Sequence, residues 1–363
     1  MTETLLRESP LAGCHQAGGA RFTQFAGWNM PLLYKGILTE HQAVRERAGV
    51  FDISHMGEIR VQGSGASDWL NTQVTNDLNR LKPQRAQYSL LLNENGGVID
   101  DLMIYRLDAD VLLIIANASR YERVAEILRS RVPDSVEIID ESDSTAALAL
   151  QGPLAGTIFQ RAFGQPMVDR NTIADFSLDG IPVFVAGTGY TGEPGCEWFF
   201  PAGQAADVWN KLIATGSDDL QPCGLASRDS LRLEVCFPLN GQDLDEDHTP
   251  LEAGLGIFAK LDKGDFVGRE ALATQKAAGV PRKLVAFAME GKSPPPRSHC
   301  RVFHQGEVVG EVTSGAQSPS LQKGVGMAYV PTAIAQPDTT IDIEIRTQGF
   351  PARIQSKPLY RKS

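Results

Sequence analysis

The sequence has no surplus of basic residues, no long apolar run and no paired cysteines. Its 363 residues include 34 Lys and Arg against 44 Asp and Glu, which gives a net charge of -10. Nucleic-acid-binding proteins usually carry a basic surplus, which argues against a nucleic-acid partner. An acidic chain can still contain a local basic pocket, so binding of an anionic small molecule remains possible. No apolar run reaches the roughly 18 residues of a membrane span, and residues 1–21 lack the charged-then-apolar order of a signal peptide. We expect no nucleic-acid partner and no membrane segment.

Cysteine and histidine are both scarce. The chain has 5 cysteines, none in CxxC spacing, and 6 histidines, none in HExxH or paired spacing. An odd and scattered set of cysteines argues against a disulfide framework or a zinc ribbon. We therefore expect reduced thiols, a cytoplasmic location and no metal site.

The residues that are present indicate a globular protein with mixed helices and strands. Hydrophobic residues make up 42% and charged residues 21%, and the length suggests two or three domains. Helical spacing predicts helices at residues 39–48, 119–128, 205–213 and 227–235. We expect the first to end at Gly49 and the second to begin with a capping box of Ser119 and Glu122. Alternation and the turn dipeptides Asn95-Gly96 and Asp179-Gly180 predict strands at residues 88–92, 98–105, 111–115 and 181–186, the first two as a hairpin.

The order of these elements suggests the fold class. Helices and strands mix without a strict βαβ rhythm, which favours an α+β fold. After a linker at residues 276–283 the helix signal disappears, and apolar residues alternate, as at Val285, Phe287 and Met289. This pattern predicts a small antiparallel barrel. The predicted domains are therefore residues 1–276 and 284–363.

Gly187, Gly189 and Gly192 match the dinucleotide-binding pattern G-x-G-x-x-G after a predicted strand. Such a site needs a helix to begin at the glycines, so that its N–H groups face the pyrophosphate. The residues that follow predict a turn and a strand instead, and Glu193 would repel phosphate. We disfavour a nucleotide site here.

The acidic run DLDEDH at residues 243–248 is similar to the start of a calcium loop. An EF-hand needs Gly at its sixth position and Glu at its twelfth, where this chain has His248 and Gly254. We therefore expect a solvated acidic loop rather than a metal site.

Asp100 and Asp101 lie inside a predicted strand, between apolar residues. Strands disfavour Asp, and a buried carboxylate costs several kcal/mol unless it is paired or hydrogen-bonded. With a period of two, Asp101, Met103 and Tyr105 share one face. The pair could form a polar patch of a site, or could bond the turn at Gly96, and the residues alone leave both alternatives open.

Glu197 and Arg228 pose a similar choice. Glu197 lies in a strand-like run, and Arg228 lies on a predicted helix face beside Leu231. They could pair with each other as a structural bridge, or present a bidentate acceptor and a forked donor to a ligand. No spacing identifies a covalent nucleophile with its base.

Together, eight segments resemble the T-protein family of the glycine cleavage system, whose members are tetrahydrofolate-dependent aminomethyltransferases. They occur in order along nearly the whole chain and are FAGWNMP (25–31), FDISHM (51–56), NENGGVIDDLMIY (93–105), LQGP (150–153), TGYTGEPGCE (188–197), GLASRDSLRLE (224–234), NGQDLDEDHTPLEAGL (240–255) and TSGAQSPSL (313–321).

This resemblance implies a three-domain, cloverleaf-like arrangement around a central channel, with two intertwined α+β domains and a C-terminal antiparallel barrel. It implies a step of one-carbon metabolism in glycine catabolism. An aminomethyl group on the lipoyl arm of H-protein loses ammonia, and tetrahydrofolate, the co-substrate, becomes 5,10-methylenetetrahydrofolate. It implies no metal and no nucleotide.

The resemblance also implies roles for single residues. Asp101 contacts the folate near its reacting nitrogens, and we expect it to act more by orientation and electrostatics than by full proton transfer. Glu197 binds the pterin edge, and Arg228 lies in the same pocket. The other implied ligand-binding residues are Met56, Tyr88, Tyr105, Asn117 and Tyr190. The family often has Ala or Gly where this chain has Ser227.

Two other functions compete with this one. A folate-dependent demethylase or methyltransferase of the same superfamily would share the fold and the pterin pocket, so Glu197 does not distinguish it. A folate-binding relative that supports iron–sulfur cluster assembly carries K-G-C-Y-x-G-Q, a string that this sequence lacks.

Overall fold

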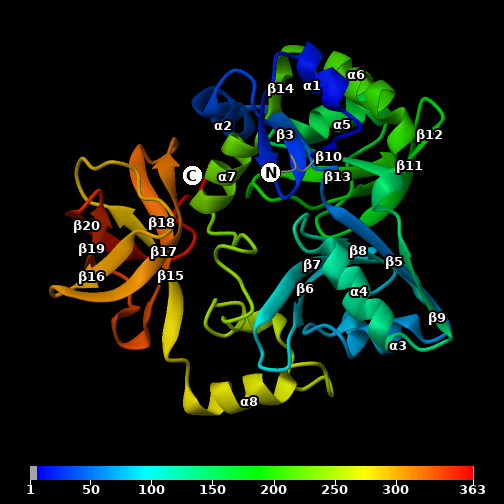
Figure 1. The fold of residues 1–363 in the computed structure, drawn as a ribbon. Coiled ribbons are helices and arrows are strands. Elements are labelled where there is room, and N and C mark those ends of the chain that lie inside the picture. Colours follow the sequence, from blue (N-terminus) through cyan, green and yellow to red (C-terminus); the bar gives the residue numbers. More distant parts are fainter. Residues whose placement is uncertain (1–5, 363) are drawn as a thin grey trace. The chain divides into compact units, whose positions relative to one another are not determined.

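The computed structural model describes residues 6–362, which form two compact units (Figure 1). The first unit comprises the described residues up to Asn71 together with Asp77–Tyr88 and Leu102–Arg228. The second comprises Thr72–Asn76, Ser89–Asp101 and the described residues from Asp229 onward. Each unit is therefore built from segments that are distant in the sequence. Within residues 6–362, no helix combines the length and the apolar character that a membrane crossing requires.

The first unit contains a six-stranded sheet in the order β11-β12-β13-β10-β4-β14. In that order the strands are Ile173–Leu178, Ile181–Ala186, Gly195–Pro201, Thr145–Gln151, Ala48–Asp52 and Leu220–Cys223. Alternate residues such as Val50, Leu148 and Trp198 form a core with apolar residues of α5 (Ala155–Phe163) and α6 (Ala205–Gly216). The opposite face of the sheet carries Glu197 and Phe199, because side chains alternate along a strand.

A five-stranded sheet has the order β6-β7-β8-β5-β9. Its strands are Arg85–Leu92, Val98–Asp108, Val111–Ala116, Gly57–Gly63 and Val136–Asp140. Helices α3 (Ala66–Asn71) and α4 (Tyr121–Arg131) pack on it, and a Cβ at Gly57 would lie 2.1 Å from the Cβ of Tyr121. Tyr105 lies on the other face, where its ring centroid is 6.1 Å from that of Phe199. The face of the six-stranded sheet that carries Phe199 therefore meets the face of the five-stranded sheet that carries Tyr105.

A buried polar network joins the N-terminal elements to the six-stranded sheet. These elements are α1 (Ala12–Ala17), α2 (Ile37–Glu46) and a sheet of β1 (Arg7–Glu8), β3 (Trp28–Leu33) and β2 (Arg21–Phe25). His15 Nε2 lies 2.8 Å from Asp52 Oδ2, and His15 Nδ1 lies 2.8 Å from the Tyr34 hydroxyl. Ser9 Oγ donates to the same oxygen of Asp52. The network fixes the end of β4.

We expect Asp52→Asn to lower the free energy of unfolding by about 1.5–3 kcal/mol, because it removes a buried charged acceptor from its hydrogen bonds. Burial raises the pKa of Asp52, but His15, Ser9 and the backbone of Ser54 together lower it below the usual 3.8. The stabilisation by ionised Asp52 is therefore present above pH 3.8, the usual pKa, and is lost as the pH falls through the lowered pKa of the folded state. Urea unfolding at neutral pH and near pH ~3 measures both effects; an equal difference at the two pH values would show that the charge of Asp52 contributes nothing to stability.

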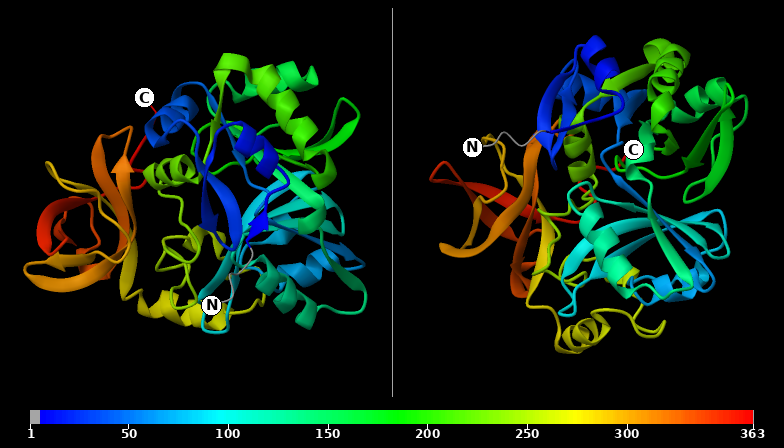
Figure 2. Two further views of the ribbon diagram at one scale, coloured as in Figure 1. Left: turned by 45° about the horizontal axis from the view of Figure 1, so that its top comes forward. Right: turned by 45° about the vertical axis from the view of Figure 1, so that its right-hand side comes forward.

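The second unit contains a closed barrel in the order β15-β18-β17-β16-β19-β20 (Figure 2, orange to red in the colour bar). In that order the strands are Arg282–Met289, Lys323–Pro331, Glu307–Ser318, Arg301–His304, Thr340–Ile345 and Gln348–Gln355. The alternating Val285, Phe287 and Met289 lie in its core with Ile341 and Ile343. The predicted barrel is confirmed. The unit also contains α8 (Arg269–Ala278), so only residues 279–281 of the predicted linker lie between helix and strand.

The expectation of a solvated acidic loop was wrong for Asp243. This residue is completely buried, and its Oδ2 accepts a hydrogen bond from Arg232 Nη1 at 2.7 Å. Thr313 and Ser314 of the barrel also donate to its carboxylate. Asp243 therefore ties the segment after α7 (Leu225–Glu234) to the barrel, and the described residues contain no group of acidic, His or Cys side chains that could hold a metal ion.

Two predicted helix ends were also wrong. Gly49 does not end a helix in the left-handed conformation; α2 ends at Glu46 and Gly49 lies in β4. A Cβ at Gly49 would lie 2.4 Å from Val44 Cγ2, so the glycine allows helix and strand to pack closely. Ser119 does not cap α4 either, because the N-cap is Arg120 and makes no side-chain capping bond. The helix at residues 205–213 and the strand at 181–186 are confirmed.

Candidate active site

Glu197 is the centre of a polar group where the six-stranded sheet faces Tyr105 of the five-stranded sheet. Its neighbours Cys196 and Trp198 point into the core, so alternation turns Glu197 to the opposite face. Glu197 Oε2 accepts hydrogen bonds from the hydroxyls of Thr188, at 2.5 Å, and Tyr105, at 3.4 Å. No hydrogen bond that is found within residues 6–362 reaches Glu197 Oε1. One carboxylate oxygen is thus held by the protein while the other stays available.

Tyr105 is completely buried and acts as a hydrogen-bond donor. Its hydroxyl lies 2.9 Å from Thr188 Oγ1. Burial raises the pKa of Tyr105 well above 10.0, and the negative charge of Glu197 raises it further. The phenol therefore keeps its proton at physiological pH, and Tyr105, Thr188 and Glu197 form a chain of hydrogen bonds that fixes the carboxylate.

The loop at residues 187–194 carries Thr188 and Tyr190 and begins no helix, as the sequence predicted. The buried Gln151 binds it twice: Gln151 Nε2 donates to Thr188 O at 3.1 Å, and Thr191 Oγ1 donates to Gln151 Oε1 at 2.8 Å. Arg45 pairs with Glu193 at 3.1 Å. A Cβ at Gly189 would lie 2.0 Å from Gln151 Oε1, so this position needs glycine.

Arg228 lies near the start of α7, which the buried Glu40 holds in place. Glu40 Oε2 accepts from the backbone N–H of Gly224, at 2.9 Å, and from Ser227 Oγ, at 3.2 Å. Ser227, a departure from the family pattern, thus gains a buried hydrogen bond. The guanidinium of Arg228 stacks on Tyr190, with Cζ 4.9 Å from the ring centroid.

The Nη1 atom of Arg228 is buried and has no hydrogen-bond partner among the described residues. No ion pair within 4.0 Å joins Arg228 to Glu197 in that part of the chain, although the two charges interact: burial lowers the pKa of Arg228, and Glu197 and Tyr190 partly restore it. A buried donor without an acceptor costs about 1–3 kcal/mol. The geometry therefore favours a ligand over a structural bridge, and the binding roles of both residues stay predictions.

Met56 and Asn117 lie at one end of the five-stranded sheet. Gly57 pairs with Ala116 at the end of the β5–β8 ladder, and Met56 and Asn117 are the residues that adjoin this end. Both are half-buried. Their predicted contacts with a ligand remain untested.

Tyr88 and Asp101 lie on neighbouring strands of the same hairpin. Tyr88 is on β6 at the limit of the first unit, and Asp101 is on β7 in the second unit. Asp100 is completely buried and Asp101 is half-buried, so both lie inside a strand and alternate in exposure as expected. The roles of Tyr88 and Asp101 stay predictions.

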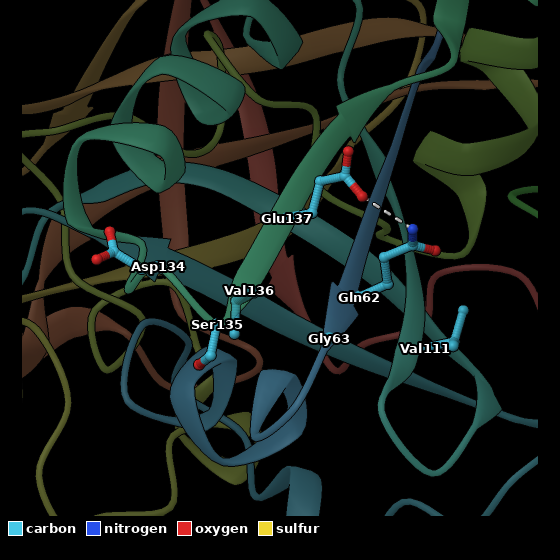
Figure 3. A pocket seen from close by; sticks show the side chains of 7 residues that line it. All are labelled: Gln62, Gly63, Val111, Asp134, Ser135, Val136 and Glu137. Atoms are coloured by element: carbon cyan, nitrogen blue, oxygen red, sulfur yellow. Dashed lines mark hydrogen bonds between the residues drawn. The ribbon is translucent and has the colours of Figure 1, made fainter.

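A surface hollow in the first unit lies away from these residues (Figure 3). Its walls come from β5, β8 and β9 and the turn before β9, and its lining residues are Gln62, Gly63, Val111, Asp134, Ser135, Val136 and Glu137. Gln62 Nε2 donates to Glu137 Oε2 at 3.0 Å across it. It shares no residue with the group around Glu197.

Sequence reasoning missed Thr188 and Gln151. Thr188 stands between Gly187 and Gly189 and begins the segment TGYTGEPGCE, and Gln151 stands in LQGP. Two glycines around a hydroxyl residue indicate close backbone approach, which could have marked Thr188. Gln151 has no such signal, because its partners are about 40 residues away along the chain.

Comparison with known proteins shows the family. The family model "GCVT N-terminal domain" matches residues 11–263, and "Glycine cleavage T-protein C-terminal barrel domain" matches residues 282–361. Both halves of the fold therefore have the architecture of a one-carbon-group transferase. The chain belongs to the glycine cleavage T-protein family of aminomethyltransferases.

Relatives match over full length. A protein of Desulforamulus reducens called aminomethyltransferase is 42% identical over 98% of this chain and 99% of its own. One of Shouchella clausii with the same name is 41% identical over 99% and 100%. The crystal structure of glycine cleavage system aminomethyltransferase T from Bartonella henselae has a TM-score of 0.92 at 35% identity, with 98% of both chains covered. The predicted family and α+β fold with a C-terminal barrel are confirmed.

Proposed function

We propose that the protein transfers the one-carbon unit of an aminomethyl group, carried on the lipoyl arm of H-protein, to tetrahydrofolate. The products are 5,10-methylenetetrahydrofolate, ammonia and the dihydrolipoyl thiol. The observation that supports this most is Glu197, anchored at Oε2 by Thr188 and Tyr105, beside an Arg228 whose Nη1 has no acceptor. We also propose a cytoplasmic location, in keeping with five cysteines that are all free thiols.

The residues fit a reduced pterin. Its aminopyrimidinone edge carries adjacent N–H donors, and a carboxylate can accept two of them at once. Such a charge-assisted contact anchors and orients the ring. Tyr190 and Arg228 stack on each other, and Tyr105 is fully enclosed, so the group combines a fixed carboxylate, a donor and flat apolar surface.

The chemistry needs one folate nitrogen to attack the aminomethyl carbon while its C–N bond to ammonia breaks. The second folate nitrogen attacks the same carbon while its C–S bond to the lipoyl sulfur breaks. The two hydrogens lost from N5 and N10 of the folate supply the third hydrogen of ammonia and the hydrogen of the thiol. We propose that Asp101 orients the folate and stabilises the positive charge that develops on the carbon. Holding both substrates in place contributes as well.

A reconstituted assay with aminomethyl-lipoyl H-protein and tetrahydrofolate tests the proposal by ammonia release. We expect ammonia and 5,10-methylenetetrahydrofolate in equal amounts. Formation of methyltetrahydrofolate from a small methylated donor, without ammonia, would instead support the demethylase alternative. Omission of H-protein is the matched control.

A further inference from the structure

His55 is a buried histidine of the first unit that lies outside the hydrogen-bond network around Asp52. It lies in the turn Ile53–Met56, which joins β4 of the six-stranded sheet to β5 of the other sheet and is closed by a hydrogen bond from Met56 N to Ile53 O at 3.0 Å. It is 2% exposed, and its ring meets Phe25 edge-on at 5.5 Å. The imidazole of His55 is thus held in a fixed position in the connection between the six-stranded and five-stranded sheets.

The Nδ1 atom of His55 is buried and has no hydrogen-bond partner within the described part of the chain. The buried His15 differs from His55, because both of its ring nitrogens have hydrogen-bond partners, Asp52 and Tyr34. Leaving a buried polar atom unpaired costs about 1–3 kcal/mol, and functional sites are where such costs are retained.

His55 and Arg228 lie at the same edge of the six-stranded sheet. Strands β4 and β14 are parallel neighbours, with Phe51 paired to Cys223. His55 follows the end of β4 and Arg228 follows the end of β14, so both emerge from the carboxyl edge of adjacent strands. His55 Nδ1 and Arg228 Nη1, which are buried and have no hydrogen-bond partner among residues 6–362, therefore belong to side chains from the same edge of the sheet.

The imidazole of His55 is neutral. Burial lowers its pKa to about 4; Asp52 partly opposes this shift, and the charge of Arg228 adds to it. Glu197 in turn interacts with Arg228. Arg228 therefore interacts with both the carboxylate of Glu197 and the imidazole of His55. The three groups offer an acceptor, a donor and a nitrogen that can accept.

We propose that His55 is a ligand-binding residue that reads the oxidation state of the pterin, by accepting a hydrogen bond from N5–H at Nδ1. This inference rests on the proposed function. Around the ring of a tetrahydropterin, the N2 and N3 donors are followed by the O4 acceptor and then by the N5–H donor. Glu197, Arg228 and His55 match that order. An oxidised pterin has no hydrogen on N5 and leaves His55 Nδ1 without a partner.

The test compares three variants by equilibrium binding of tetrahydrofolate and of folic acid. His55→Phe keeps a flat ring and removes Nδ1, whereas His55→Asn keeps an acceptor near the place of Nδ1. His299→Gln, on the exposed barrel surface, is the control. We expect His55→Phe to weaken tetrahydrofolate binding about tenfold and folic acid binding less than about threefold. His55→Asn should restore most of the preference for tetrahydrofolate.

Equal weakening of both ligands by His55→Phe, or no weakening, would overturn the inference. Failure of the wild-type protein to bind tetrahydrofolate would instead overturn the proposed function. If His55→Phe does not fold, nitrogen NMR of the wild-type protein decides. The His55 resonance, identified by its loss in His55→Asn, should shift with tetrahydrofolate and not with folic acid, and an unchanged resonance would contradict the proposal.

Discussion

Replacing Asp101 by Asn is expected to lower kcat for ammonia release by about 10²–10⁴-fold, the usual contribution of a positioned acid–base or charged group. Asn keeps the size and one acceptor of Asp but loses the negative charge that would stabilise a cationic carbon. The folate dissociation constant should change much less than kcat, because the pterin is held elsewhere. Steady-state ammonia release and equilibrium folate binding separate the two effects.

Asp108→Asn is the matched control, because Asp108 lies on the same strand at its exposed end. This variant should retain wild-type turnover. Near-normal turnover of Asp101→Asn, with methylene transfer intact, would remove any catalytic role from Asp101.

Glu197→Gln is expected to raise the dissociation constant of tetrahydrofolate by about 10²-fold or more, since two hydrogen bonds to a charged group are altered at once. The amide can still accept from Thr188, so the fold should survive. Its NH2 group, however, faces the N–H donors of the pterin, which it cannot accept. Titration of the folate and the KM for tetrahydrofolate measure the loss.

Glu137→Gln provides the comparison for Glu197. Glu137 lines the surface hollow, where its side chain accepts a hydrogen bond from Gln62. Its replacement should leave folate binding unchanged. A large loss in Glu137→Gln and none in Glu197→Gln would place the ligand in the hollow instead.

The sequence predicted elements best where the signal was local. The Asn95-Gly96 hairpin, the strand after Asp179-Gly180 and the alternating barrel strands are confirmed, because turn dipeptides and two-residue alternation depend on neighbours in the chain. Helix ends were predicted less well. At Gly49 the deciding contact is with Cys223, whose sulfur would lie 2.8 Å from an added Cβ, and no local pattern reports that contact.

The sequence alone determined the family, the α+β class, the C-terminal barrel and the residue types of the candidate site. Only the tertiary structure decided which polar groups already have partners. It pairs Asp243 with Arg232 and Glu193 with Arg45, and it anchors one oxygen of Glu197. It leaves His55 Nδ1 and Arg228 Nη1 without a hydrogen-bond partner among the described residues. The physical reason is that the cost of burying a polar atom depends on what strands distant in sequence bring to it.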